Sequence, residues 1–205
     1  PGEYVVDVVP PLDPVTPLRL TRRSATLAPG APPVLVEPLP RSQVSGTIVD
    51  PASAPLAGAS VTAVLLEARY GDPRLIRPGE VPPARVVTGV TNPAGRFDLA
   101  LDPGRHRLLV QPPPDRGLPP FAIEVAFSGE SGRPADVGEV TTPPGAAITV
   151  SLVTEEGQPL AGAAVEAWRR DETPLRLSNG VTDAQGRVVL AVPASSGAAA
   201  PDAGL

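Results

Sequence analysis

The stretch GVTNPAGRFDLALDPGRHRLLV, residues 89–110, joins strand-like alternation to two recognisable turns. Residues 92–95 (NPAG) place Asn first, Pro second and Gly fourth, which is the order that a type I turn prefers. Residues 96–101 then carry apolar side chains with the period of two of a half-buried strand. Residues 102–104 (DPG) put Gly third, where a type II turn needs positive φ. We therefore predict a β-hairpin with the inward-facing set Phe97, Leu99, Leu101, His106, Leu108 and Val110.

Parts of this stretch recur elsewhere in the chain. GVTNPAGR at 89–96 returns as GVTDAQGR at 180–187, an offset of 91 residues. PLAGASV at 55–61 returns as PLAGAAV at 159–165, an offset of 104 residues. The two offsets differ because the first copy carries a longer excursion, a Pro- and Gly-rich surface loop at residues 70–83.

A third echo defines the modules. PGEYVVDVVPP at 1–11 matches PGRHRLLVQPP at 103–113, an offset of 102 residues. Agreeing offsets of about a hundred residues are the length of one β-sandwich module. We predict the closing half of a module at 1–40, a complete module at 41–143, and the opening half of a third module with a flexible tail at 144–205.

The composition narrows both fold and function. The 205 residues include 30 Pro and 20 Gly between alternating segments, no Cys, no Met and no Lys, and the net charge is -5. Missing Lys and Cys exclude lysine Schiff bases, P-loop lysines, disulfides and zinc-thiolate sites. An acidic chain with scattered Arg argues against nucleic acid as a partner. Because helix capping and 3.6-residue periodicity are missing, we predict an all-β protein.

The ordered motifs VSGTIVD, PLAGASV, GVTNPAGRFDLAL and DPGRHRLLV together resemble the carboxypeptidase regulatory-like domain family. The resemblance covers 41–112 well, 145–193 moderately and 1–36 in part. It implies tandem Greek-key β-sandwiches of the prealbumin-like or Ig-like kind, similar to transthyretin and to the B-type repeats of surface adhesins. It also implies a non-catalytic accessory or spacer domain. Two departures concern packing: the third module lacks a Gly in ITVSLVT, and the aromatic position of Tyr4 is taken by His106.

Catalytic and metal chemistry find little support in the residues. His106 is the chain's one His, so a two-histidine metal site is excluded, and its likeness to Tyr4 favours an aromatic role at the edge of the core. No GxSxG motif accompanies it. The acidic turn residues do not follow a calcium-loop pattern, and turn capping by Asn92 and Asp183 explains them more simply. We expect no enzyme activity, no cofactor and no metal.

Trp168 is the strongest candidate for contact with a partner. Alternation places Glu166, Trp168 and Arg170 on the outward face of their strand, opposite Val165 and Ala167. An outward Trp could stack on a sugar or a protein surface, and the alternative is packing beneath a neighbouring module or loop. Tyr70, at the start of the 70–83 loop, is a further candidate contact.

The leading prediction is a structural and interaction protein, with tandem sandwiches as spacers in a secreted or surface-attached bacterial protein. Its partners would be other modules of the same protein or envelope proteins, with no membrane insertion in this segment. Pro-rich stretches at 32–40 and 112–120 would be stiff connectors. One alternative is a carbohydrate- or protein-binding module that uses the Trp168 face or the 70–83 loop. A third possibility is donor-strand assembly, in which the half-modules of neighbouring chains complete each other. The competing explanation, which we favour, is that the half-modules result from excision from a longer repeat array.

Overall fold

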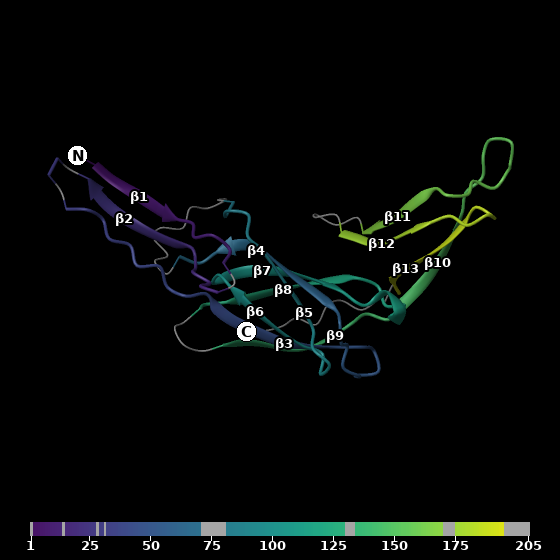
Figure 1. The fold of residues 1–205 in the computed structure, drawn as a ribbon, viewed down its shortest axis with the longest axis horizontal. Helices are drawn as coiled ribbons and strands as arrows, with labels where there is room; N and C mark the ends of the chain where they lie inside the picture. Colours follow the sequence, from purple (N-terminus) through teal and green to yellow (C-terminus); the bar gives the residue numbers. More distant parts are fainter. Residues whose placement is uncertain are drawn as a thin grey trace. The chain divides into compact units, whose positions relative to one another are not determined.

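The structure is a computed structural model of the chain and describes residues 2–13, 15–27, 29–30, 32–70, 81–129, 134–169 and 175–194. Its strands are β1 (Gly2–Val8), β2 (Thr21–Leu27), β3 (Ser42–Val49), β4 (Ser60–Ala68), β5 (Val86–Val90), β6 (Arg96–Leu101), β7 (Gly104–Gln111), β8 (Phe121–Phe127), β9 (Ala135–Thr141), β10 (Gly145–Ser151), β11 (Ala164–Arg169), β12 (Leu175–Val181) and β13 (Arg187–Pro193) (Figure 1). A short 3-10 helix, η2 (Pro114–Arg116), lies between β7 and β8. The all-β prediction is confirmed.

The chain divides into two compact units. The first consists of residues 1–111 with 122–141, and the second of residues 112–121 with 142–205. In the first unit, a three-stranded sheet with the order β6-β3-β9 and a four-stranded sheet with the order β5-β4-β7-β8 form a β-sandwich. Its core is mostly aliphatic, and its fully buried large side chains include Phe97, Ile48, Leu56, Leu101 and Leu108.

The first turn of residues 89–110 is as predicted, with the Gly95 N–H bonded to the Asn92 carbonyl at 2.8 Å. Gly104 has positive φ, but its value of 143° is not that of a type II turn, and the predicted hairpin does not form. The inward-facing set, His106 included, is buried throughout. However, β6 pairs with β3 in one sheet, whereas β5 and β7 both pair with β4 in the other. Each turn therefore carries the chain across the sandwich. Alternation shows which face of a strand is buried, and that face is the same for a strand that pairs with its neighbour and for one that crosses to the opposite sheet.

β1 and β2 form a separate two-stranded antiparallel sheet, which we call the arm (residues 2–27). Leu20, just before β2, packs against Leu65 and Ala68 at the end of β4, and Tyr70 lies against this cluster. Over Tyr70, the guanidinium of Arg22 stacks 4.1 Å from the ring centroid. The arm is thus joined to the sandwich by side chains next to β2.

The second unit contains two antiparallel strand pairs, β10 with β13 and β11 with β12. Their buried side chains include Leu177, Val188, Leu190 and Val192. Most of the predicted 70–83 loop and the tail beyond residue 194 lie outside the described residues.

Candidate functional site

The same hydrogen-bonded frame is built in both units. The Thr91 hydroxyl accepts a 2.9 Å hydrogen bond from the Ala59 N–H and donates a 2.6 Å bond to the Leu56 carbonyl. The second unit repeats the two bonds, at 2.9 and 2.7 Å, with Thr182, Ala163 and Leu160. These residues stand at the offsets of 91 and 104 found in the sequence, so the sequence repeat is also a repeat of structure.

The turns that follow are also equivalent. Asn92 accepts hydrogen bonds from the N–H groups of Ala94 and Arg96 through Oδ1, each at 3.0 Å. In the second unit Asp183 accepts from the N–H groups two and four residues on, at 2.9 and 2.8 Å. The predicted capping role of Asn92 and Asp183 is what the geometry shows.

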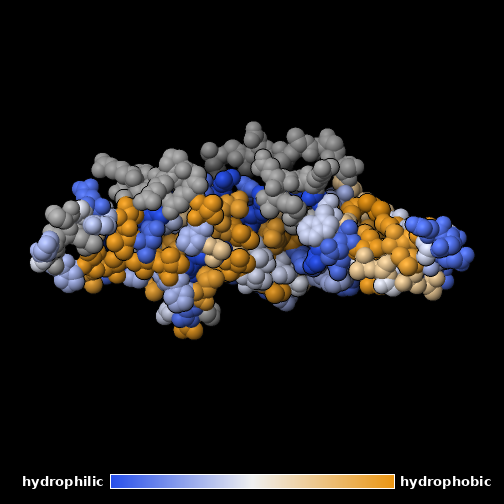
Figure 2. All heavy atoms as spheres, turned by 90° about the horizontal axis from the view of Figure 1, so that it is seen from above, coloured by the Kyte–Doolittle hydropathy of each residue, from blue (hydrophilic) through white to orange (hydrophobic). Residues whose placement is uncertain are grey.

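Equivalent apolar positions differ sharply in exposure. Val44 and Leu56 of the sandwich are 0% and 1% exposed, whereas their counterparts Ile148 and Leu160 are 48% and 43% exposed. In Figure 2, hydrophobic residues gather on the visible face of the second unit, beside the hydrophilic loop after β10. Among the described residues, the second unit therefore leaves exposed some of the apolar positions that are buried in the sandwich.

The open strand edges account for this difference. In the sandwich, β3 lies between β6 and β9, and β4 lies between β5 and β7. Their counterparts β10 and β11 each have one partner among the described strands. Among the described strands, β10 and β11 thus each leave open an edge that is paired in β3 and β4, and open edges are where further strands add.

A buried ion cluster joins the arm to the sandwich. The carboxylate of Asp102 lies 2.9 Å from Nε of Arg85 and 3.5 Å from Nε of Arg41, and all three side chains are buried. Its Oδ1 accepts a 2.6 Å hydrogen bond from the Leu20 N–H. Arg85 also donates to the Pro10 carbonyl at 2.6 Å. The cluster therefore holds the main chain at Pro10 and Leu20 against the sandwich.

His106 lies beside this cluster on β7. Its ring is buried and stacks on Phe127 with centroids 5.5 Å apart. Burial lowers the pKa of His106, and the nearby Asp102 carboxylate only partly opposes that shift. Burial likewise raises the pKa of Asp102, against the Leu20 N–H and the charge of Arg85. His106 is accordingly a neutral ring at physiological pH, and it lies within the core rather than at the predicted edge.

Sequence reasoning missed this cluster. Asp102 was read as a turn residue, and nothing in the surroundings of Arg41 and Arg85 in the sequence marks them as its partners. They come from three separate strand ends, so only the sheet topology brings them together. The one available signal is that Asp102 and Arg41 directly flank the paired strands β6 and β3.

The predicted contact residues lie in different units. On β11, Trp168 is 54% exposed and donates from Nε1 to Glu166 at 3.1 Å. Glu166 in turn accepts a 3.1 Å hydrogen bond from Arg176 on β12. Tyr70 belongs to the first unit, where it packs beneath Arg22. Arg170 lies outside the described residues.

In the part of the chain that the structure describes, no group of three or more His, Asp or Glu residues is arranged to hold a metal ion. No helix formed by the described residues is long and apolar enough to cross a membrane.

Comparisons with known proteins give distant likenesses only. No protein-family model matches the chain, and a search of curated proteins finds no match. Among solved structures, a streptococcal ancillary pilin aligns over 94% of this chain at 14% identity with a TM-score of 0.30. A shaft pilin from Lactobacillus rhamnosus GG aligns over 80% of this chain and 89% of its own at 17% identity, with a TM-score of 0.32.

A 9R-lipoxygenase from Cyanothece PCC8801 aligns over 50% of this chain at 16% identity, with a TM-score of 0.31. The matched region spans 16% of the lipoxygenase and 63% of the ancillary pilin, less than two thirds of either. Likeness at this level assigns neither a reaction nor a partner to this chain.

Proposed function

We propose that this chain is a non-catalytic structural and interaction protein whose carboxypeptidase regulatory-like β-sandwich modules act as spacers in a secreted or cell-surface bacterial protein. The repeated Thr91 and Thr182 frames support tandem modules of one type. Its partners are other modules of the same protein or proteins of the cell envelope. A spacer must hold its length under tension, and the strand order of the sandwich serves that purpose.

The first and last strands of the sandwich pair in parallel. β3 opens the module and β9 closes it, with Val44 opposite Ala135 and Val49 opposite Thr141. Tension applied through the chain pulls the start of β3 and the end of β9 in opposite directions along the strand axis. All inter-strand hydrogen bonds of the pair are then loaded together. This parallel pairing is the observation that carries the spacer proposal.

Single-molecule pulling along two axes tests it. Since the chain has no Cys, introduced cysteines provide unique attachment points. Pulling through Gln43→Cys and Thr141→Cys shears β3 against β9. Pulling through Gln43→Cys and Ala100→Cys instead separates β3 from β6 one hydrogen bond at a time. Gln43 and Ala100 are antiparallel partners, and they lie where β3 begins and β6 ends.

We expect a clearly higher unfolding force along the first axis. Chemical denaturation of both double variants provides the control, because equal stabilities would assign the force difference to direction alone. Equal unfolding forces along the two axes would contradict a load-bearing spacer.

Trp168 supports a second candidate function, binding of carbohydrate or of another protein. Its indole N–H is engaged by Glu166, which fixes the ring and leaves it more than half exposed. The sandwich has Val64 at the equivalent position, so this exposed ring is particular to the second unit. A fixed, exposed aromatic ring is a stacking platform for sugars or apolar side chains.

A glycan pull-down tests this candidate directly. Retention by the unmodified chain and its loss in Trp168→Ala would support a carbohydrate site. Val86→Ala, which removes another exposed apolar side chain, should keep retention. Equal retention by Trp168→Ala and the unmodified chain would rule out the Trp168 face.

A further inference from the structure

The repeat identifies which kind of strand would pair with the open edge of β11. The repeat makes β11 the counterpart of β4, and β12 the counterpart of β5. In the sandwich, β4 pairs with β5 on one side and with β7 on the other. Among the described strands, β11 pairs with β12 alone. The open edge of β11 is therefore the edge that a strand like β7 would occupy.

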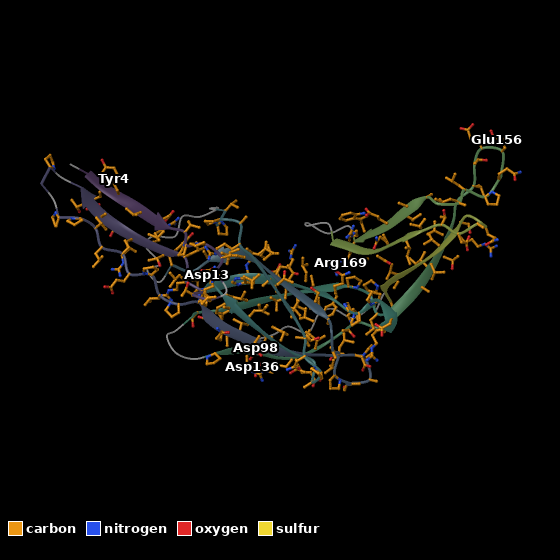
Figure 3. The ribbon with its side chains drawn as sticks, viewed as in Figure 1. Tyr4, Asp13, Asp98, Asp136, Glu156 and Arg169 are labelled. Atoms are coloured by element: carbon orange, nitrogen blue, oxygen red, sulfur yellow. The ribbon has the colours of Figure 1, made fainter. Side chains whose placement is uncertain are left out.

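The chain contains a second strand of this kind, β1. Gly2, Tyr4, Val6 and Val8 stand at the positions of the buried β7 residues Gly104, His106, Leu108 and Val110. β7 lies between β4 and β8, whereas β1 pairs only with β2 among the described strands. Tyr4 is 51% exposed, although its counterpart is buried (Figure 3). β1 thus has the sequence of a central strand and the surroundings of an edge strand.

We propose that β1 of one copy of this chain adds to β11 of a second copy, so that the order β12-β11-β1-β2 reproduces β5-β4-β7-β8. The repeat also sets the register. Val61 pairs with Val110 and Ala63 with Leu108 in the sandwich. The equivalent contacts between copies pair Val165 with Val8 and Ala167 with Val6. Main-chain hydrogen bonds supply affinity and the alternate side chains supply specificity, as in other cases of strand addition.

The sandwich itself favours a contact between copies. The arm is clamped where β3 begins, since Arg41 and Leu20 both contact Asp102. Residues 142–205 of the second unit follow Thr141, which pairs with Val49 at the opposite end of β3. At about 3.3 Å per residue, these ends are on the order of 25 Å apart. Within the first unit, the arm and the chain's exit after Thr141 thus lie at opposite ends of β3, an arrangement that head-to-tail association of copies can use.

The apolar surface of the second unit gives a reason for the association. Ile148 and Leu160 are nearly half exposed, although their counterparts are fully buried in the sandwich. Addition of β1 would place Val6, Val8 and Tyr4 on the inward side, as β7 places its own residues. Burial of apolar surface would accompany the new hydrogen bonds and stabilise the contact.

Disulfide trapping between copies tests the register. Val8→Cys and Val165→Cys chains, mixed under oxidising conditions, should form a disulfide-linked dimer because the two positions are direct partners. Val5→Cys mixed with Val165→Cys is the matched control, since Val5 is exposed but lies on the opposite face of β1. Cross-linking equal to that of the control would overturn the proposed register and with it the contact.

Sedimentation with two complementary variants tests the association itself. Val6→Asp should abolish donation and Ala167→Asp should abolish acceptance, so each alone should remain monomeric. Their mixture should form a dimer through the one intact donor and acceptor, a rescue that simple loss of folding would not give. The unmodified chain should form larger species as concentration rises. An unmodified chain that stays monomeric at all concentrations overturns the proposal.

Association of copies through β1 and β11 does not depend on the spacer function. The pulling experiment depends on β3 and β9 within one copy, whereas trapping and sedimentation depend on β1 and β11 in different copies. Either proposal can therefore fail while the other holds.

Discussion

Nε of Arg85 lies 2.9 Å from Oδ2 of Asp102, and both side chains are buried. Arg41 approaches the same oxygen at 3.5 Å, so one buried carboxylate faces two buried guanidinium groups. Since the Leu20 N–H and the Pro10 carbonyl also bind this cluster, the charges hold the arm as well as the sandwich. The arm is thereby kept in one place relative to the module.

Asp102→Asn should strongly destabilise the first unit. The amide keeps an acceptor for the Leu20 N–H but leaves Arg85 and Arg41 buried without a counter-charge. Removing one partner of a buried ion pair typically costs about 3–5 kcal/mol. Urea unfolding measures the loss, and Asp98→Asn is the control, because Asp98 forms an exposed pair with Arg96. Exposed pairs contribute about 0–1 kcal/mol. Equal midpoints for the two variants would show that the cluster does not stabilise the fold.

His106→Phe should remove part of the acid sensitivity of the chain. Burial lowers the folded pKa of His106 below its ordinary 6.5, so the unfolded chain binds this proton first as the pH falls. The stability that depends on neutral His106 is therefore complete above about pH 6.5 and declines as the pH falls through that value towards the folded pKa. Phe cannot titrate and preserves stacking on Phe127. The measurement is the unfolding midpoint as a function of pH for the unmodified chain and the variant. Asp102 is present in both proteins, so the difference between the two curves reports His106. Parallel curves would contradict a neutral, buried His106.

Thr91→Val should destabilise more than Thr182→Val. Both replacements keep the shape and remove a hydroxyl that bridges an N–H and a carbonyl. The Thr91 bonds are buried, so their loss leaves two polar groups unsatisfied at about 1–3 kcal/mol each. Thr182 is buried too, but its partner Leu160 is 43% exposed, so water can reach the groups that lose their bonds. Thr88→Val, which breaks an exposed hydroxyl contact with Thr62, is the control. Denaturation followed separately in each unit gives the comparison, and a larger effect at Thr182 would contradict the difference in burial.

Much of the fold could be predicted because turns and alternation are local. Residues 92–95 carry the preferences of their turn, and Leu99 and Leu108 show their inward direction through spacing alone. The pairing of strands could not be predicted in the same way. The alternation of buried residues in β6 would be the same if it paired with β5 in one sheet as it is with β6 paired to β3 in the other. The Asp102 cluster was hidden for a related reason: charges from distant strand ends meet only when the sheets are assembled.

Trp168 shows the opposite case. Its outward direction follows from alternation with Val165 and Ala167, and the structure leaves it exposed. The repeat offsets also predicted which residues share a role, and Thr182 and Asp183 bond as their counterparts do. What the offsets did not reveal is the exposure of Ile148, because burial depends on strands that lie outside the repeated motif.

Gly95→Ala should cost more than Gly162→Ala, although both residues have nearly the same backbone conformation. Gly95 has φ of 73° and Gly162 has φ of 75°, so each replacement forces Ala into the left-handed region, a strain of about 1 kcal/mol. At Gly95 the new Cβ would also lie 2.5 Å from the Ile48 carbonyl oxygen, whereas nothing lies within 4 Å at Gly162. The extra loss at Gly95 therefore measures how tightly the turn packs on β3. Gly186→Ala provides a check from the repeat, since its Cβ would lie 2.4 Å from the Leu152 carbonyl oxygen. Urea denaturation of the three variants should place Gly95 and Gly186 together and Gly162 apart, and equal losses at all three would show that backbone strain alone sets the cost.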